Sequence, residues 1–598
     1  MRLTPQQMAA SLQELQQLEQ AGRMSELADK LWRQIMNVFF EPYVQIAPEE
    51  AQMLNLFGKL IMKLFANPAF QIPKELEYDY ANCTVCISNL VYFTEFKTTD
   101  LVLKMLIEQK APIAKQLAFY SYRNTVELDV EAMFAQNPAL VFGWMTSVLC
   151  HGHPNALHPE QDAWCKRLLR LKALRTRSDY INTRRYYQLL TSTYIDYTQD
   201  KQVKTAINRA FSAQLPNIKA STTPNMNKVL IISSMMFPSH AVYKSMYPLL
   251  ASLEDHYEVI YIRPPETKSE DIVIAGKKVK DDLLHSEWEF NKVVPRILQE
   301  QAGIIIYPEV GMDLLCVELS NLRLAPIQLS MYGHPVSTHA KEIDYFIASR
   351  DVEITKETKD IYSERPVLIP GMAAISVYPD YALQHPQRAQ RHTGKRIINC
   401  AWGTIKLNSG LIQMLKQIKE RSQSDLLFRF TDIWWQYFSF PQIKRDLEEI
   451  LGAEHVECLP AFAYKDYMYT LEEGDFALDS YPFCGFNRTV DTLFCGKAII
   501  SREGDRFYNR AGAYILRQIG LEELVAHNEE EYIELAVRMA DDEEFRARMT
   551  GIVKAHDLKT TLCNTDSARY FRKAIDTLVA GDKDFRRQKT NTPILISE

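Results

Sequence analysis

The sequence lacks the features that mark membrane-spanning, exported or nucleic-acid-binding proteins. In its 598 residues no run of about 18 apolar residues predicts a transmembrane helix. The first residues, Met1–Gln7, lack the apolar stretch of a signal peptide. The net charge is −6, so the basic excess typical of a nucleic-acid binder is missing. We therefore expect a cytoplasmic protein with no membrane span and no nucleic-acid partner.

Cysteine is sparse and scattered, with ten residues in the whole chain. This usage predicts free thiols in a reducing compartment and not a disulfide framework. Cys83 and Cys86 form a lone CxxC inside an apolar run, without the second pair that a zinc site needs. A second cluster, without clear zinc spacing, consists of Cys150, His151, His153, His158 and Cys165. We expect neither set to bind a metal.

The first third of the chain has few glycines and prolines and no alternation typical of strands. Apolar residues recur at helical spacing over 12–18, 27–39 and 53–65, and again over 101–122, 140–150 and 164–174. No fixed-period repeat is present, so a tetratricopeptide array is not predicted. We expect an all-helical domain over residues 1–215, followed by a linker at 214–226.

From residue 227 onward, apolar strands alternate with helices, which predicts parallel α/β sheets. In a first half, 227–380, the expected strands are Val229–Ile232, Val259–Ile262, Ile304–Tyr307, Ile327–Met331 and Tyr345–Ala348. In a second half, 395–580, they are Ile397–Ala401, Leu426–Phe430, His455–Leu459, Phe476–Leu478 and Ala498–Ser501. Residues 373–394 are expected to connect the halves, and 586–598 to form a loose tail.

The stretch 475–512 is the most informative part of the sequence. It predicts a strand at Phe476–Leu478, a loop at Tyr481–Phe486 and a helix that begins at Asn487. Loops at the carboxyl ends of strands bind ligands in open α/β sheets, and helix N-termini favour phosphate. Asp491, one turn into the helix, could accept hydrogen bonds from sugar hydroxyls. The alternative is an ordinary crossover with a polar first turn.

A second block consists of Leu324–Leu329, Tyr332–Pro335 and Ile343–Ile347. Together the two blocks resemble the glycosyltransferase family of the protein O-GlcNAc transferases. They are most similar to its bacterial cytoplasmic N-glucosyltransferases, which modify high-molecular-weight adhesins. The resemblance covers residues 227–580 and implies the GT-B architecture, two Rossmann-like halves with the active site in the cleft between them. The helical domain fits the N-linked group, where it would shape the acceptor side or act as a structural brace.

Transfer from a nucleotide sugar requires that the charge of the diphosphate leaving group be stabilised. The only Asp-x-Asp triplet, Asp582–Asp584, is expected beyond the last helix as a solvated charge cluster. We therefore expect no metal and no cofactor apart from the donor substrate. The resemblance carries a diphosphate-binding lysine over to Lys406, and Thr404 would add a hydroxyl contact.

Further donor contacts are expected in the second half of the chain. Three consecutive residues would cradle the phosphates, and Asp491 would hold the ribose. These three are Asn487, Arg488 and Thr489, of which Arg488 could instead be a structural ion-pair partner. The uracil is expected near Ala461 and Phe462.

Two histidines, His240 and His334, follow strands of the first half and are expected to face the same cleft. Histidine suits proton transfer or hydrogen bonding to a substrate, although a loop histidine can also be structural. The resulting hypothesis is an inverting, metal-independent transfer of glucose from UDP-glucose to asparagine in Asn-x-Ser/Thr sequons of proteins such as adhesins. The alternatives are O-linked GlcNAc transfer to Ser/Thr and a non-catalytic adaptor that binds nucleotide.

Overall fold

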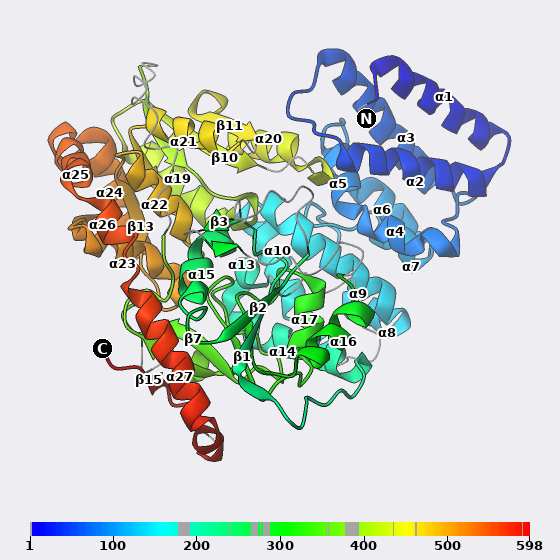
Figure 1. Ribbon diagram of the computed structural model, residues 1–598. Coiled ribbons are helices and arrows are strands. Elements are labelled where there is room, and N and C mark those ends of the chain that lie inside the picture. Colours follow the sequence, from blue (N-terminus) through cyan, green and yellow to red (C-terminus); the bar gives the residue numbers. More distant parts are fainter. Residues whose placement is uncertain are drawn as a thin grey trace. The chain divides into compact units, whose positions relative to one another are not determined.

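The computed structural model (Figure 1) describes residues 3–176, 190, 192–237, 240–264, 273–274, 277–278, 288–354, 356, 358–376, 394–433, 436–460, 463–588 and 590–598. The chain divides into two compact units. The first consists of Met1–Gln199 with Arg391–Asp475, and the second of Asp200–Gln390 with Phe476–Glu598. Neither unit is contiguous in sequence.

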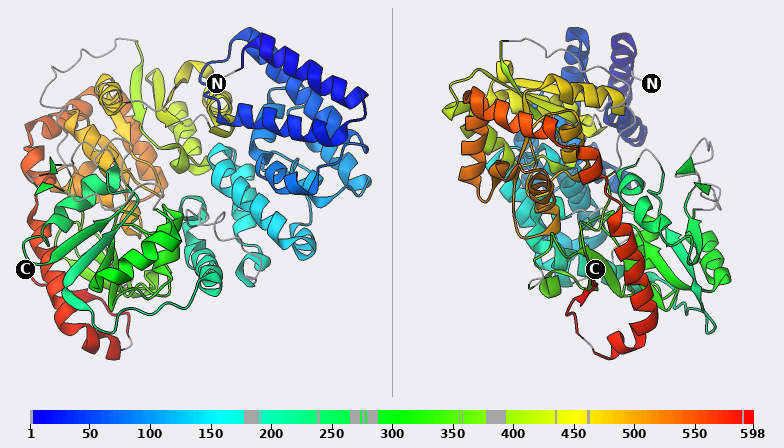
Figure 2. Two further views of the ribbon diagram at one scale, coloured as in Figure 1. Left: turned by 45° about the vertical axis from the view of Figure 1, so that its right-hand side comes forward. Right: turned by 60° about the vertical axis from the view of Figure 1, so that its left-hand side comes forward.

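The first unit begins with helices, drawn in blue to cyan in Figures 1 and 2. They are α1 (Pro5–Gln20), α2 (Met24–Phe40), α3 (Pro48–Ala66), α4 (Glu77–Asn82), α5 (Thr84–Tyr92), α6 (Asp100–Glu108), α7 (Ile113–Leu117), α8 (Val130–Gln136), α9 (Pro138–Ser147), α10 (Pro159–Leu169), α11 (Lys172–Thr176) and α13 (Thr193–Asp196). The expected helix at 101–122 is two helices, because Pro112 lacks the N–H that a continuous helix needs.

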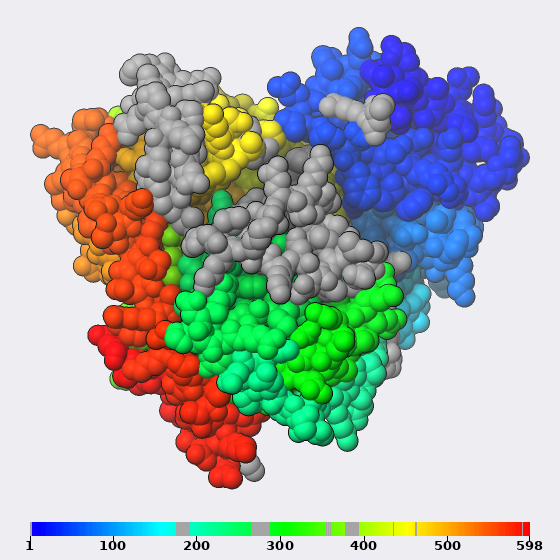
Figure 3. All heavy atoms as spheres, viewed as in Figure 1, coloured from blue at the N-terminus to red at the C-terminus, as the bar shows by residue number. Residues whose placement is uncertain are grey.

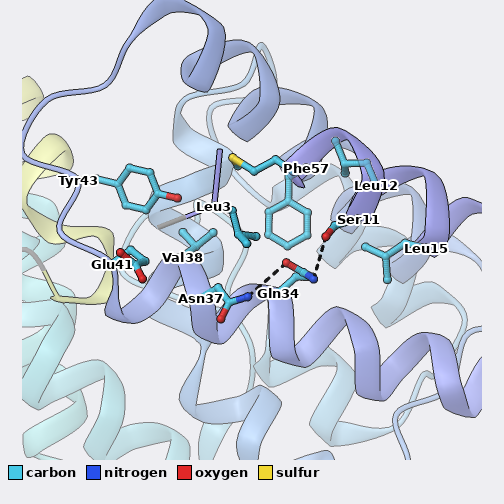
Figure 4. A pocket seen from close by; sticks show the side chains of 11 residues that line it. Leu3, Ser11, Leu12, Leu15, Gln34, Asn37, Val38, Glu41, Tyr43 and Phe57 are labelled. Carbon is cyan, nitrogen blue, oxygen red and sulfur yellow. Dashed lines mark hydrogen bonds between the residues drawn. The ribbon is translucent and has the colours of Figure 1, made fainter. Parts of the chain in front are cut away.

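Apolar faces at helical spacing build the core of this helical domain. Leu31, Leu64 and Phe65 are fully buried, and the rings of Tyr120 and Trp144 stack 5.5 Å apart. A small crevice remains among α1, α2 and α3, where Gln34 Nε2 donates to Ser11 Oγ over 3.1 Å (Figure 4). Its volume is about 20 Å³, which is room for about one water molecule and not for a substrate.

The same unit contains three parallel strands, in the order β11-β10-β9. Their bounds are β9 (Arg396–Cys400), β10 (Leu426–Ile433) and β11 (Val456–Pro460), joined by α19 (Ser409–Arg421) and α20 (Ser439–Leu451) and followed by α21 (Tyr464–Glu473). The helical domain packs on these elements through buried polar pairs. Arg123 Nη2 lies 2.7 Å from Asp446 Oδ2, and Asn155 Nδ2 donates to Ser439 Oγ over 3.3 Å.

The second unit contains a seven-stranded parallel sheet in the order β15-β8-β7-β6-β5-β1-β2. Its strands are β1 (Asn225–Ile232), β2 (Glu258–Ile262), β5 (Ala302–Tyr307), β6 (Ile327–Ser330), β7 (Tyr345–Ser349), β8 (Arg365–Ile369) and β15 (Ile594–Leu595). Helices of this part are α14 (Asp200–Gln214), α15 (Ala241–Ala251), α16 (Phe290–Glu300), α17 (Leu314–Ser320) and α18 (Thr358–Ile361). A two-stranded ribbon is formed by β3 (Val273–Ile274) and β4 (Lys277–Lys278).

The second unit also holds the strands β12 (Phe476–Leu478), β13 (Ile499–Arg502) and β14 (Val525–Ala526), again parallel. Its helices are α22 (Phe486–Phe494), α23 (Ala511–Gln518), α24 (Glu529–Asp541), α25 (Glu543–Ala555), α26 (Leu558–Leu562) and α27 (Asp566–Arg587). The fold is thus α/β with two parallel, Rossmann-like sheets and a helical N-terminal region, the GT-B architecture that was expected. In the part of the chain that the structure describes, no helix is long and apolar enough to cross a bilayer.

Two expectations about the C-terminus are wrong. The tail at 586–598 is not loose, because Ile594 and Leu595 pair with β8. Asp582 lies inside α27, where it accepts a hydrogen bond from the Tyr345 hydroxyl over 2.7 Å. It also forms an ion pair with Arg586, whose Nε lies 2.9 Å from Asp582 Oδ2. Figure 3 shows the red C-terminal residues lying directly on green residues of the first half. Asp582 therefore fastens α27 to β7 and is not a solvated charge.

Candidate active site

The loop between β12 and α22 is held in place by one buried carboxylate, Asp479. Its Oδ1 accepts hydrogen bonds from the backbone N–H groups of Ser480 (2.9 Å) and Gly485 (2.7 Å). Its Oδ2 accepts from Ser501 Oγ over 2.8 Å. A Cβ at Gly512 would lie 2.5 Å from the same Oδ2, so only glycine fits there. These contacts fix the start of α22 relative to β13.

Helix α22 begins with a turn that is suited to an anion. The first i→i−4 hydrogen bond runs from Thr489 N to Gly485 O over 3.0 Å. The N–H groups of Phe486 and Asn487 therefore precede the hydrogen-bond ladder, at the positive end of the helix dipole. Asn487 and Arg488 are half-buried. The predicted phosphate residues are brought together at this helix end, with Asp491 one turn further on.

Thr489 departs from the expectation that it would contact phosphate. Its side chain is fully buried, and both its hydroxyl and its N–H donate to Gly485 O. These two bonds use the donors that a phosphate would need. Thr489 therefore stabilises the first turn of α22.

His240 lies at the N-terminus of α15, a helix that contacts α22. Ser245 Oγ in α15 donates to Asn487 Oδ1 over 3.3 Å. His240 caps α15, because its Nδ1 accepts a hydrogen bond from Val242 N over 3.2 Å. Burial, and then the positive charge of Lys244, lower the pKa of His240. The ring is therefore neutral near pH 7, and because Nδ1 accepts the Val242 N–H, the proton lies on Nε2, which can donate a hydrogen bond.

His334 follows β6 and is also neutral. Burial, together with the charge of Lys204, lowers its pKa to about 3. Its Nε2 is buried without a hydrogen-bond partner among the described residues. The preceding Gly333 allows the close approach of two loops, since a Cβ there would lie 2.5 Å from Pro308 O. With so low a pKa, His334 is a weak base.

Glu309 is a candidate functional residue that the sequence analysis missed. It follows β5 and is fully buried, and Ser233 Oγ lies 2.8 Å from each of its carboxylate oxygens. Burial raises the pKa of Glu309 to about 8. Because β1, β5 and β6 are parallel neighbours, Ser233, Glu309 and His334 follow strands at the same sheet edge. The sequence signal that could have identified Glu309 is its position as a polar residue shortly after the strand β5.

In the first unit, Lys406 lies in a 3₁₀ turn, Thr404–Lys406, just after β9. Thr404 is buried and its hydroxyl donates to Asp432 O, in β10, over 3.1 Å. Asn408 Nδ2 donates to Lys406 O over 3.0 Å, and Asn408 Oδ1 caps α19. Lys406 is half-buried, and the hydrogen bonds of Thr404 and Asn408 hold its loop in place. Thr404 thus supports this loop from within.

A buried network behind this loop connects it to the helical domain. Asp162 of α10 accepts hydrogen bonds from Ser409 Oγ (2.9 Å) and Lys166 Nζ (2.7 Å), and its Oδ1 lies 3.0 Å from His153 Nε2. Burial alone would raise the pKa of Asp162, but His153 and Lys166 lower it to about 2. The first turn of α19 therefore rests on a charged side chain of the helical domain.

The remaining candidates are the expected uracil contacts and the two clusters of cysteine and histidine. Ala461 and Phe462 lie outside the described residues, just after β11. Cys83 and Cys86 are buried thiols, and burial raises the pKa of Cys83 to about 12. His153, from the second cluster, bonds to Asp162. Among the described residues no group of three or more His, Cys, Asp or Glu side chains is placed to hold a metal ion.

Comparison with known proteins gives matches over several parts of the chain. Residues 466–572 match the family described as Glycosyl transferase family 41. Two Actinobacillus pleuropneumoniae proteins, each described as UDP-glucose:protein N-beta-glucosyltransferase, are 26% and 27% identical to this chain. The matches cover 57% and 49% of this chain, and 55% and 46% of the relatives. The chain thus spans about half the length of these relatives.

Two further similarities broaden the comparison. A Solanum lycopersicum protein described as a probable UDP-N-acetylglucosamine–peptide N-acetylglucosaminyltransferase, SPINDLY, is 30% identical over 42% of this chain and 27% of its own length. A solved mutant of the Thermobaculum terrenum O-GlcNAc transferase aligns with a TM-score of 0.58 and 17% identity. That alignment covers 97% of this chain and 99% of the other, and it shows a shared fold.

Proposed function

We propose that this chain is a member of glycosyl transferase family 41, whose model matches residues 466–572, and that it transfers glucose from UDP-glucose to asparagine side chains in Asn-x-Ser/Thr sequons of proteins. The observation that carries this proposal is the similarity to the two N-beta-glucosyltransferases over about half of the chain. The β product named for those relatives is what inversion at an α-linked UDP-glucose would give. Adhesins are the acceptors that the resemblance implies.

On the donor side, two positive features would stabilise the diphosphate as its bond to the sugar breaks. One is the Lys406 ammonium, and the other is the N-terminus of α22 at Phe486 and Asn487. Asp491 would accept hydrogen bonds from the ribose, and Arg488 would add a cation near the phosphates. With these groups no divalent cation is required, so transfer should persist in excess EDTA. Loss of activity on chelation, restored by magnesium or manganese, would contradict this assignment.

On the acceptor side, we assign the two histidines as orienting groups. The Nε2–H of His240 would donate a hydrogen bond to an oxygen of the sugar or of the acceptor, since its Nδ1 already accepts from Val242 N. Neutral His334 would offer its buried ring nitrogen in the same way. Alignment of the acceptor amide with the anomeric carbon supplies the entropic part of catalysis. The pH dependence of transfer should therefore not show a histidine pKa near 6.5.

The proposed cellular setting is the cytoplasm. All ten cysteines are free thiols, as expected in a reducing compartment. The proposed partners are the UDP-sugar and a sequon-bearing polypeptide.

A second candidate is O-linked transfer of GlcNAc to serine or threonine. The similarity to the SPINDLY protein favours it, because that relative is described as a UDP-N-acetylglucosamine–peptide transferase. The donor groups described above would serve either sugar. The two candidates differ in the acceptor atom.

The test uses three peptides that differ at one position each, Asn-x-Thr, Gln-x-Thr and Asn-x-Ala, incubated with UDP-glucose or UDP-GlcNAc. We expect one hexose on the asparagine of the first peptide, none on the glutamine, whose extra methylene misplaces the nitrogen, and strongly reduced transfer to the third. The site is located by fragmentation in a mass spectrometer. A sugar on threonine, or equal transfer to the glutamine peptide, would favour the O-linked candidate.

A further inference from the structure

The helical domain contains a cavity that the proposed chemistry does not use. Its volume is about 420 Å³, within the range of small-ligand pockets. Side chains of α2, α4 and α9 line it, together with His151 and with Tyr437 of the β10–α20 connection. Its aromatic walls are Trp32, Phe39, Phe40, Tyr78 and Tyr437. All of these residues belong to the first unit.

The backbone around the cavity is unusual at two places. His151 lies in a π-helical turn, Val148–Gly152, a rare conformation that is frequently found at functional sites. Tyr437 and Phe438 both have left-handed backbone angles, with φ of 59° and 57°. Such residues are strained and concentrate at ligand sites. The result is that the Tyr437 hydroxyl meets His151 Nε2 at 2.9 Å and its ring contacts Phe39, with centroids 3.8 Å apart.

The cavity belongs to the same edge of the sheet as Lys406. Strands β9 and β10 are parallel partners, so their carboxyl ends lie at one edge. Lys406 follows β9, and Tyr437 follows β10. The Thr404 hydroxyl of the first connection donates to Asp432 O near the end of β10. The turn Thr404–Lys406 contacts His153–Asn155, which directly follow the π-helical turn of His151, so the cavity lies near the Lys406 loop.

The charge of the lining is one-sided. Asp79 is the one carboxylate among the lining residues, and none of them is a lysine or an arginine. The negative charge of Asp79 adds to burial in raising the pKa of Cys83, which also lines the cavity. Aromatic faces beside a carboxylate attract a cation, and the attraction is stronger where the site is desolvated.

We propose that this cavity is an acceptor subsite, which takes a lysine or arginine side chain flanking the modified residue of the polypeptide. The proposal rests on the transfer to polypeptides put forward above. The subsite would add a preference for particular residues outside the sequon, which the proposed function does not specify. Met36 and Phe40 would contact the aliphatic stem of the bound side chain, while Asp79 and the aromatic rings face its charge.

The test scans one lysine through the neutral flanks of an Asn-x-Thr peptide and measures KM and kcat at each position. At one position lysine should lower KM roughly threefold to thirtyfold relative to norleucine, the range of one such contact, with kcat unchanged. Glutamate at that position should raise KM. Asp79→Asn should remove most of the preference for lysine and leave KM for the neutral peptide unaltered.

The matched control is Glu75→Gln, which removes an exposed carboxylate four residues earlier that does not line the cavity. It should keep the preference for lysine. Anisotropy of labelled lysine and norleucine peptides, with UDP present, measures binding without transfer, so the subsite remains testable if the proposed chemistry fails. Equal affinity for lysine, norleucine and glutamate peptides would overturn the proposal. So would a lysine preference that survives Asp79→Asn, or a preference for norleucine over lysine.

Discussion

The ion pair between Arg123 and Asp446 joins the helical domain to α20, and its removal should be costly. The two side chains are 3% and 0% exposed and their nearest atoms are 2.7 Å apart. Gln442 Nε2 also donates to Asp446 Oδ1 over 2.8 Å. Asp446→Ala would leave the Arg123 guanidinium buried without its counter-charge. We expect a loss of about 3–5 kcal/mol in the free energy of unfolding.

The ion pair need not make the folded protein more stable than a pair of apolar side chains would. Burying two charges costs several kcal/mol each, and Arg123 Nε is buried without a hydrogen-bond partner among the described residues. The free energy of unfolding of the double variant Arg123→Met/Asp446→Leu should therefore lie within about 1–2 kcal/mol of that of the parent, because no isolated charge remains. The contrast between the single and double variants separates an uncompensated charge from a simple loss of packing.

The assay is urea unfolding followed by tryptophan fluorescence, with hydrogen exchange to locate the change. In Asp446→Ala, amides of α20 and of the segment around Arg123 should lose protection together. Glu449→Gln is the matched control, since Glu449 accepts from the Tyr92 hydroxyl at the exposed rim of the same contact, over 2.6 Å. It should cost less than about 1 kcal/mol. A single variant as stable as the parent, or a double variant as unstable as Asp446→Ala, would refute the reasoning.

Three further predictions concern the candidate site. Lys406→Ala should lower kcat more than about 100-fold without changing the unfolding curve. The control is Lys416→Ala, at an exposed position of α19, which should leave kcat unchanged. Gly512→Ala should weaken UDP binding measured by calorimetry, because the new Cβ would lie 2.5 Å from Asp479 Oδ2 and displace the α22 loop, while Gly551→Ala, with open space around it, should not. Glu309 keeps its proton in the folded state up to a pKa of about 8, whereas the unfolded chain loses it near 4.5, so stability should fall as pH rises between these values. Glu309→Gln should flatten that part of a pH series of urea midpoints, and an unchanged slope would contradict the assignment.

The sequence predicted the strands that are continuous apolar runs. Each of the ten predicted strands overlaps a strand of the structure, such as Val229–Ile232 within β1. Among the described residues, the five strands that it missed are β3, β4, β8, β14 and β15. Strand β8 starts with Arg365 and Pro366, and the other four are two residues long. Proline removes a ladder donor and is expected only at edges, yet here β15 covers β8 on its outer side.

The site was predictable only where a local motif reports it. Lys406 was proposed from the loop after an apolar strand, and Asn487 and Asp491 from the start of the helix, α22, that follows another such strand. Burial raises the pKa of Glu309, and the hydrogen bond that opposes this shift comes from Ser233, a residue 76 positions away. Asp162 holds Ser409 across 247 positions. Such partners are set by the fold, and no spacing rule in the sequence connects them.

With the proposed subsite, the helical domain would bind the acceptor in addition to acting as a brace. The aromatic walls from α2 and α4 are useful to a substrate only if Tyr437 stays against Phe39, and Tyr437 is carried by the connection that leads into α20. Asp446 fixes α20 to the helical domain, so its loss should disturb the cavity as well as stability. We therefore expect Asp446→Ala to lose the preference for a flanking lysine even at temperatures where the protein stays folded, and the apolar double variant to regain it. The lysine-scanned peptides measure this directly. A preference that persists in folded Asp446→Ala would mean that the cavity keeps its shape without the ion pair.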